Sequence, residues 1–208
     1  MAIIALVGNK GGAGKTTLAV NLAFALARSA STALLDADPQ GSALQWQTLA
    51  TREDGPDAYD ASVDLEGLVA QLAPHYSHLI IDCPPSVHAP QTHAALRVCN
   101  LALVPVQPSP VDLWATVHIA NAVEAARGHN PTLTALLVIN QLESRTTLSR
   151  LMPIALAELE LPVAKTALRR RAIYRASAVE GKSVLDMGKR GTDAADELNQ
   201  LINEVLSQ

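Results

Sequence analysis

The chain has 208 residues and a formal net charge of −4, and 49% of its residues are hydrophobic although only 3% are aromatic. This length suits one domain with a substantial core, which the low aromatic content leaves to Ala, Leu, Val and Ile. No apolar run reaches the ~18 residues that a membrane-spanning helix needs, and the first residues lack the basic flank of a signal peptide. Cys83 and Cys99 have neither metal-ligand spacing nor a disulfide framework, so we expect two small buried thiols in a cytoplasmic protein.

Short apolar runs alternate with segments of helical periodicity along the chain. The apolar runs predict strands at 2–8, 31–38, 78–84, 100–108 and 134–141, and a weaker one at 161–168. Helical periodicity predicts helices at 15–29, 41–51, 64–73, 88–97, 111–127, 147–159, 171–179 and 193–206, while 52–60 is expected to be a surface loop. This alternation predicts a single doubly wound α/β domain over 1–208, with a mainly parallel sheet flanked by helices.

A glycine-rich loop, "NKGGAGKT" at 9–16, follows the first strand and opens the first helix. In that context it predicts a phosphate-binding loop, because glycines let backbone N–H groups face phosphate oxygens at a helix N-terminus. Lys15 is expected to reach the β- and γ-phosphates and the Thr16 hydroxyl to ligate Mg²⁺. Asn9 departs from the usual pattern, which begins with glycine. A glycine-rich turn that binds no nucleotide is the alternative.

Acidic residues end two of the predicted strands. Asp82 lies near the end of 78–84, and Asp36 and Asp38 lie at the end of 31–38. Because α/β sheets place ligands at the carboxyl ends of their strands, Asp82 is expected to hold Mg²⁺ through water. Asp36 and Asp38 share one face of their strand, so both are expected to point toward the metal and the attacking water. The alternative is that this pair caps the helix that follows.

Together these segments resemble the ParA/MinD superfamily of P-loop ATPases. "KGGAGKTT" resembles the deviant Walker A motif, K-G-G-x-[GA]-K-[ST]-[ST], in which the first glycine is characteristically missing. "DADPQGSALQW" is similar to the A′ motif, and "LIIDCPPS" to the Walker B and switch II segment. "VINQLESRTTL" resembles the strand and loop that contact adenine. The resemblance covers nearly the whole chain.

The resemblance implies an ATPase with ATP and Mg²⁺ as cofactors. Lys10 matches the signature lysine, which crosses an ATP-sandwich homodimer to reach the partner subunit's phosphates. Asp38 matches the carboxylate that positions the hydrolytic water, so Lys10, Lys15 and Asp38 are the expected catalytic residues. Thr16, Asp36 and Asp82 match residues of the Mg²⁺ shell. The residues matching nucleotide contacts are Gly11, Gly12, Ala13, Gly14, Lys15, Thr16, Thr17, Asn140, Pro108 and Pro110.

The C-terminal tail separates branches of the superfamily. MinD-like members end in a basic amphipathic helix, whereas the tail here, "DAADELNQLINEVLSQ", carries four acidic residues and no basic one. We therefore expect it to pack on the domain and not to bind a membrane. The first strand begins at residue 2, so we expect the short kind of member, without the N-terminal helix-turn-helix domain of long ones. The chain is thus most similar to short ParA-like partition or cargo-positioning ATPases.

Basic residues concentrate in one segment. Residues 165–191 carry eight Lys or Arg against two acidic residues, a balance of +6, which leaves −10 for the rest of a chain of net charge −4. This segment is expected to bind DNA without sequence preference through phosphate contacts, and an ordinary solvated surface is the alternative. The expected contacts are Arg169, Arg170, Arg171, Arg175 and Lys182. Tyr174 is expected to pack half-buried, with a stacking role as the alternative, and Trp114 is either a core residue or part of the dimer face.

These features predict an ATP-dependent, dimerising ATPase that binds DNA non-specifically on the nucleoid. It is expected to partition or position a cargo, which is a plasmid, a chromosome or a protein organelle such as a carboxysome. A ParB-like or organelle-type adaptor protein is expected to stimulate its hydrolysis. A MinD-like spatial regulator and a metabolic ATP-dependent enzyme on the same scaffold are the alternatives.

Overall fold

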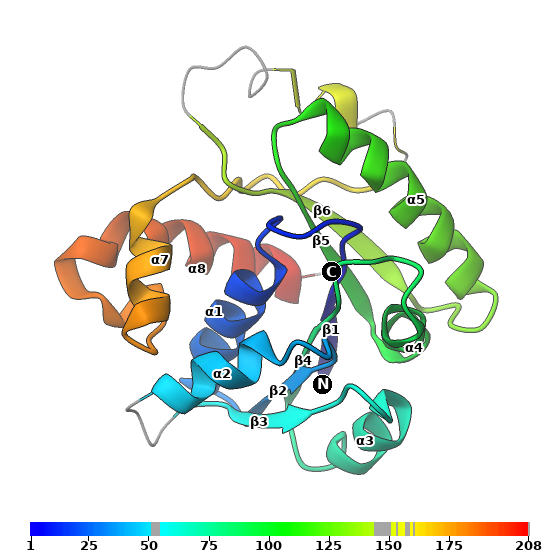
Figure 1. Ribbon diagram of the computed structural model, residues 1–208, viewed down its shortest axis with the longest axis horizontal. Helices are drawn as coiled ribbons and strands as arrows, with labels where there is room; N and C mark the ends of the chain where they lie inside the picture. Colours follow the sequence, from blue (N-terminus) through cyan, green and yellow to red (C-terminus); the bar gives the residue numbers. More distant parts are fainter. Residues whose placement is uncertain (51–54, 144–150, 153, 157–158, 160, 208) are drawn as a thin grey trace.

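Six parallel strands form a sheet at the centre of the molecule (Figure 1). They lie in the order β3-β2-β4-β1-β5-β6, and each neighbouring pair runs parallel. The strands are β1 Ala2–Leu6, β2 Thr32–Asp36, β3 Asp57–Asp60, β4 His78–Asp82, β5 Leu101–Val106 and β6 Thr134–Ile139. The computed structural model describes residues 1–208 except 51–54, 144–150, 153, 157–158, 160 and 208.

Helices cover both faces of this sheet. They are α1 Lys15–Ala27, α2 Ser42–Leu49, α3 Leu65–Leu72, α4 Pro90–Val98, α5 Pro110–Arg127, α7 Ala172–Val179 and α8 Thr192–Leu206, with short 3₁₀ turns at Val184–Asp186 and Gly188–Gly191. Alternate residues of a strand face opposite sides, so Ile4 packs with α1, α2 and α8, whereas Ile3 packs with α3, α4 and α5. The predicted doubly wound α/β architecture is confirmed.

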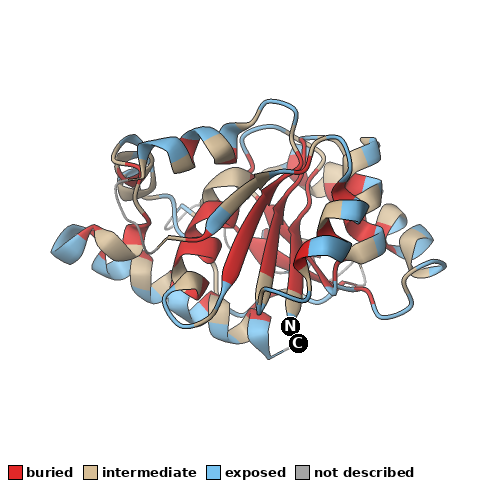
Figure 2. Ribbon diagram, turned by 90° about the horizontal axis from the view of Figure 1, so that it is seen from below, coloured by how far each residue is buried: buried red, intermediate tan, exposed pale blue. Residues whose placement is uncertain are grey.

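The buried residues follow the central strands (Figure 2). Most of their side chains are aliphatic. Every residue of β2 and β5 is buried, because helices cover both faces of a parallel sheet. Cys83 and Cys99 are free, buried thiols within this core, as their sequence context predicted.

One strand lies where a loop was expected. Residues Asp57–Asp60 form β3, which pairs with β2 at the edge of the sheet, so the prediction of a loop over 52–60 was wrong for this part. The segment "DAYD" has no apolar run, because an edge strand has a neighbouring strand on one side only and its side chains remain partly exposed. Its backbone pairing with β2, and not its side chains, makes it a strand.

The weak strand predicted over 161–168 is also different in the structure. This segment runs beside β6 but makes only isolated bridges, Val163 with Leu137 and Arg169 with Leu142, within the described residues. The Glu204 carboxylate accepts the backbone N–H groups of Lys165 at 2.7 Å and Thr166 at 2.8 Å. These groups are therefore turned away from a ladder with β6. Most of the helix predicted over 147–159 lies outside the described residues.

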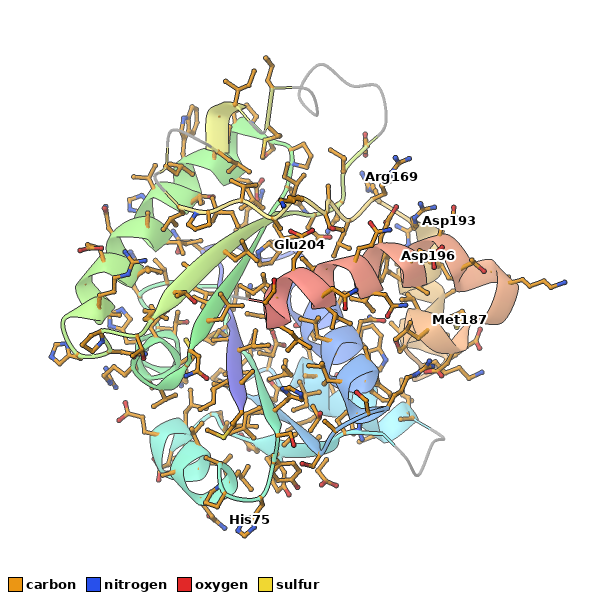
Figure 3. All side chains as sticks on the ribbon, turned by 180° about the vertical axis from the view of Figure 1, so that it is seen from behind. His75, Arg169, Met187, Asp193, Asp196 and Glu204 are labelled. Carbon is orange, nitrogen blue, oxygen red and sulfur yellow. The ribbon has the colours of Figure 1, made fainter. Side chains whose placement is uncertain are left out.

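The C-terminal helix α8 packs on the domain. Leu198 and Leu201 are fully buried against α1 and the sheet, which agrees with the packing expected from the sequence. Figure 3 shows Glu204 near one end of α8, and Arg169 beside Asp193 and Asp196 near the other. Among the described helices, none is both long and apolar enough to cross a membrane.

Candidate nucleotide-binding site

The loop between β1 and α1 forms a cradle of backbone groups. Gly12 and Gly14 have φ angles of 80° and 93°, a left-handed conformation that glycine adopts without steric cost. Gly14 precedes the first turn of α1, and no side chain caps that helix end. The N–H groups of the first turn are therefore available to an anion, which the helix dipole also favours. The pocket at this point is lined by Gly11, Gly12, Gly14, Lys15, Thr16, Thr17, Asp38, Pro85 and Gln141.

Lys15 lies beneath this loop with its ammonium group held in place. Its side chain is 6% exposed, and its Nζ donates to the Lys10 carbonyl at 3.2 Å. Burial lowers the pKa of Lys15, and the nearby Asp82 carboxylate opposes that shift. A Cβ atom on Gly8 would lie 3.2 Å from the Lys15 Cδ. Gly8 is therefore a site residue that the sequence analysis missed, although its place between strand and loop was a usable signal.

Asp82 fits a metal ion. Both of its carboxylate oxygens are buried and accept no hydrogen bond from the residues that the structure describes. Burial raises the pKa of Asp82 to about 7, and the neighbouring Thr16 hydroxyl opposes the rise. A divalent cation would stabilise the ionised form of such a carboxylate. No cluster of three or more His, Cys, Asp or Glu occurs in the described ranges, and Mg²⁺ commonly needs few protein ligands beside water and phosphate.

Asp36 and Asp38 have different surroundings. The Asp36 carboxylate accepts backbone N–H groups from Ala43 at 2.9 Å and Leu44 at 3.0 Å, and from Asp38 at 3.2 Å. Its oxygens therefore cap the N-terminus of α2, which is the alternative role considered for this pair. Burial raises the pKa of Asp36, and these backbone hydrogen bonds oppose the rise. Asp38 instead borders the phosphate pocket, half-buried, where water and phosphate can reach it.

Lys10 is held by its own chain. Its Nζ lies 2.7 Å from Oδ2 of Asp112 in the first turn of α5, and the two side chains are 38% and 5% exposed. Ser109 caps α5 by accepting the Asp112 backbone N–H at 3.2 Å, and its hydroxyl also bonds the Asp112 carboxylate. The neighbouring Asn9 Oδ1 accepts the Val87 backbone N–H at 3.1 Å, which ties this loop to the segment after β4.

A second pocket adjoins the phosphate pocket and shares Gly14, Thr17 and Gln141 with it. Its other lining residues are Leu18, Asn140, Leu168, Arg169, Arg170, Arg171, Tyr174, Arg175 and Ala178. Asn140 lies at its inner wall, where its Nδ2 donates to the Ala13 carbonyl at 2.7 Å. Pro108 and Pro110 line neither pocket, and Pro110 instead begins α5. The position of this pocket, directly beside the phosphate pocket, suits the base and ribose of a nucleotide.

The basic segment meets acidic residues that the fold brings to it. Arg171 pairs with Asp193 at 2.9 Å and with Glu197 at 2.7 Å, and Arg169 lies 3.6 Å from Glu197. The further pairs are Arg170 with Glu143 at 2.7 Å and Lys182 with Glu180 at 2.9 Å. Counting charge along the segment missed the arginine pairs, because α8 and the loop after β6 supply their acidic partners, whereas Glu180 lies within the segment itself. Of the five expected DNA contacts, Arg175 is the one without an ion pair among the described residues.

The two aromatic residues left open by the sequence are placed by the structure. Tyr174 packs partly buried against the α1 side of the core, and burial raises the pKa of its hydroxyl. This agrees with the expected packing. Trp114 lies on the outer side of α5 and is 69% exposed, so it is not a core residue.

Comparisons with known proteins agree with this geometry. Residues 4–184 match the CobQ/CobB/MinD/ParA nucleotide binding domain. The chain is 40% identical over 206 residues to the "Maintenance of carboxysome distribution protein A" of Halothiobacillus neapolitanus, covering 98% of this chain and 95% of that protein.

Two solved structures share the fold and hold nucleotides. A variant of Cyanothece McdA in complex with ATP superposes with a TM-score of 0.81 at 17% identity, covering 100% of this chain and 96% of that one. The septum site-determining protein MinD of Pyrococcus horikoshii, complexed with Mg-ADP, gives a TM-score of 0.73 at 21% identity, with 98% and 95% covered. The chain therefore belongs to the CobQ/CobB/MinD/ParA family, and its phosphate loop is that of a ParA/MinD-type nucleotide-binding ATPase.

Proposed function

We propose that this chain is an ATP-driven, dimerising ATPase that positions carboxysomes, or a comparable protein organelle, by binding non-specifically to nucleoid DNA in the cytoplasm. The observation that carries the proposal is the 40% identity with the carboxysome distribution protein, which extends over 98% of this chain. Lys10 adds support from geometry. It stands in the phosphate loop, yet it lies outside the residues that line its own phosphate pocket and bonds Asp112 instead.

ATP and Mg²⁺ are the cofactors that the site suits. In this proposal the phosphates lie at the N-terminus of α1, where Lys15 and the backbone N–H groups balance their charge. Thr16 would hold Mg²⁺ directly and Asp82 would hold it through water, and the bound ion would neutralise charge on the transferring phosphoryl group. Asp38, at the rim of the pocket, accepts a hydrogen bond from the attacking water and orients it.

Lys10 makes hydrolysis depend on a second subunit. Charge on the transferring phosphoryl group is stabilised by a cation in a site that excludes water, and the partner subunit's Lys10 supplies it in the ATP-sandwich dimer. Moving Lys10 from Asp112 to the partner subunit's phosphates costs free energy, because it leaves the buried Asp112 carboxylate without its cation. Phosphate contacts in the dimer must offset that cost, so the dimer forms only with ATP bound and separates after hydrolysis.

DNA binding relies on basic side chains of the 165–191 segment. Arg175 is the first candidate, because it is exposed and has no ion pair within the described residues. Arg169, Arg170 and Lys182 contribute through their exposed sides while keeping their acidic neighbours. An adaptor protein on the cargo stimulates hydrolysis and so releases the ATPase from DNA.

Retention of a random-sequence DNA duplex tests this proposal. We expect retention with ATP but not with ADP or without nucleotide, and we expect it to fall steeply as salt rises. Arg175→Ala should weaken retention at saturating ATP, a condition needed because Arg175 also lines the second pocket. Arg97→Ala, which removes an exposed arginine from α4, should not weaken it. Equal weak retention in all three nucleotide states would contradict the proposal.

The ATPase rate measured with and without DNA separates the alternatives. A metabolic ATP-dependent enzyme on this scaffold would ignore DNA and require a small acceptor. A MinD-like spatial regulator would instead respond to vesicles of anionic lipid.

A further inference from the structure

Three side-chain amides donate hydrogen bonds to backbone carbonyl groups of the phosphate loop. Gln107, directly after β5, donates from Nε2 to the Gly12 carbonyl at 2.6 Å. Gln141, just after β6, donates from Nε2 to the same carbonyl at 2.9 Å. Asn140 donates from Nδ2 to the next carbonyl, that of Ala13, at 2.7 Å. Two consecutive peptide groups of the loop are thus held by residues about a hundred positions away in the sequence.

These contacts fix the direction of two backbone N–H groups. A trans peptide group is planar, with its C=O and N–H pointing in opposite directions. The Gly12 carbonyl points to Gln107 and Gln141, so the N–H of Ala13 in the same peptide group points the other way. The Ala13 carbonyl turns to Asn140, and the N–H of Gly14 is reversed likewise. Both N–H groups therefore point away from the amides that hold their carbonyl groups, and Gly14 lies in the lining of the phosphate pocket.

The amides are themselves anchored to the sheet. Asn140 donates its backbone N–H to the Val106 carbonyl at 2.9 Å, and its Oδ1 accepts the Gln141 backbone N–H at 2.9 Å. Gln141 has a φ of 55°, and it is the one residue other than glycine with a positive φ in the described chain. Such a conformation persists where surrounding structure imposes it, often at a functional site.

The approach of Asn140 to the loop is close. A Cβ atom on Gly14 would lie 2.3 Å from the Asn140 Nδ2, so only glycine fits at this position. Glycine at position 14 is therefore favoured for two reasons. It adopts a φ of 93° without steric cost, and its missing side chain leaves space for the Asn140 amide.

We propose that Gln107 and Gln141, acting with Asn140, are positioning residues that hold the phosphate loop in its anion-binding conformation before nucleotide arrives. Their amide groups donate to carbonyls of the phosphate loop, so they set the affinity for the polyphosphate part of the nucleotide. This role goes beyond the proposed function, because it requires neither dimerisation nor DNA.

The experiment replaces the amide donors while keeping side-chain length. Gln107→Met, Gln141→Met and the double variant are compared with Gln71→Met, which removes an exposed glutamine from the distant helix α3. Calorimetric titration measures the Kd of each variant for Mg-ATP and for inorganic tripolyphosphate with Mg²⁺. One lost hydrogen bond should raise Kd about fivefold, and the double variant should raise it about twentyfold, by the same factor for both ligands.

Three further outcomes decide the proposal. Gln141→Gly removes the donor but relaxes the positive φ, so it should lose affinity as Gln141→Met does while remaining at least as resistant to urea. Faster hydrogen exchange at the Ala13 and Gly14 amides of the unliganded double variant would support a preset loop. Unchanged affinity for tripolyphosphate in a folded double variant would overturn the proposal, as would a loss confined to ATP, which would place these glutamines at the base.

Discussion

The Nζ of Lys10 lies 2.7 Å from Oδ2 of Asp112, across 102 positions of sequence. Lys10 is partly exposed whereas Asp112 is buried, so the lysine is the member of the pair that can leave. The loop that binds phosphate and the first turn of α5 are thereby joined by one ion pair. In the proposed cycle, Lys10 leaves Asp112 when the dimer forms and contacts the phosphates of the partner subunit's nucleotide instead.

Asp112→Asn tests that exchange. The substitution removes the carboxylate charge but keeps the side-chain shape, so Lys10 is held less tightly in the monomer. We expect the ATP-dependent dimer to form at a several-fold lower protein concentration, because a partly exposed ion pair contributes about 1 kcal/mol. Light scattering across a protein dilution series with ATP measures this, with Glu66→Gln, which breaks the exposed pair with Arg97, as the control. A dimer of unchanged or lower affinity would count against the role of Asp112.

Asp36→Ala should destabilise the fold through α2. The Asp36 carboxylate accepts the Ala43 and Leu44 backbone N–H groups, so its removal leaves buried donors unpaired. We expect the free energy of unfolding in urea to fall by about 1–2 kcal/mol. Asp60→Ala, an exposed aspartate that accepts one loop N–H, should cost less. An unchanged unfolding midpoint for Asp36→Ala would show that the cap contributes nothing.

Glu204 should make stability depend on pH. Burial alone would raise the pKa of Glu204, but hydrogen bonds from the Thr166 hydroxyl and the backbone N–H groups of Lys165 and Thr166 outweigh it and lower the pKa. A lowered folded-state pKa gives stability that is present above the ordinary value of 4.5 and is lost as pH falls through the folded value. Glu204→Gln should therefore be less stable than the parent at pH 7, and the difference should shrink toward pH 3. A difference that is constant with pH would contradict this.

The thiols should be inert in the folded protein. Burial raises the pKa of Cys99 to about 12 and that of Cys83 well above its ordinary value, so neither forms thiolate near neutral pH. Iodoacetamide at pH 8 should label both cysteines in urea and neither in the native state, as mass spectrometry would show. Rapid native labelling of either one would mean that the core around β4 opens.

The sequence predicts the phosphate loop well and its partners poorly. Gly12, Gly14 and Lys15 act through local backbone conformation, which neighbours in the chain determine. Asp112 and Gln107 reach the loop only because β5 lies beside β1 in the sheet, an order that no short motif encodes.

The ion pairs of the basic segment and the strand β3 were missed for a related reason. The basic segment looked unbalanced until α8 placed Asp193 and Glu197 against Arg171. Strand β3 carries no hydrophobic signature, because its pairing with β2 and not its burial defines it. Contacts between distant segments decided each case.

Mixing two inactive variants tests the central claim, that Lys10 serves the nucleotide of the partner subunit. Lys10→Ala and Asp38→Ala should each bind ATP and fail to hydrolyse it as homodimers. In a mixed dimer, the Lys10→Ala subunit keeps its own Asp38 and receives Lys10 from the Asp38→Ala partner, so one site is complete. An equal mixture should therefore recover about one quarter of the parent rate, since half of the dimers are mixed and each has one working site. A mixture that stays inactive would contradict the claim and place the action of Lys10 within its own subunit.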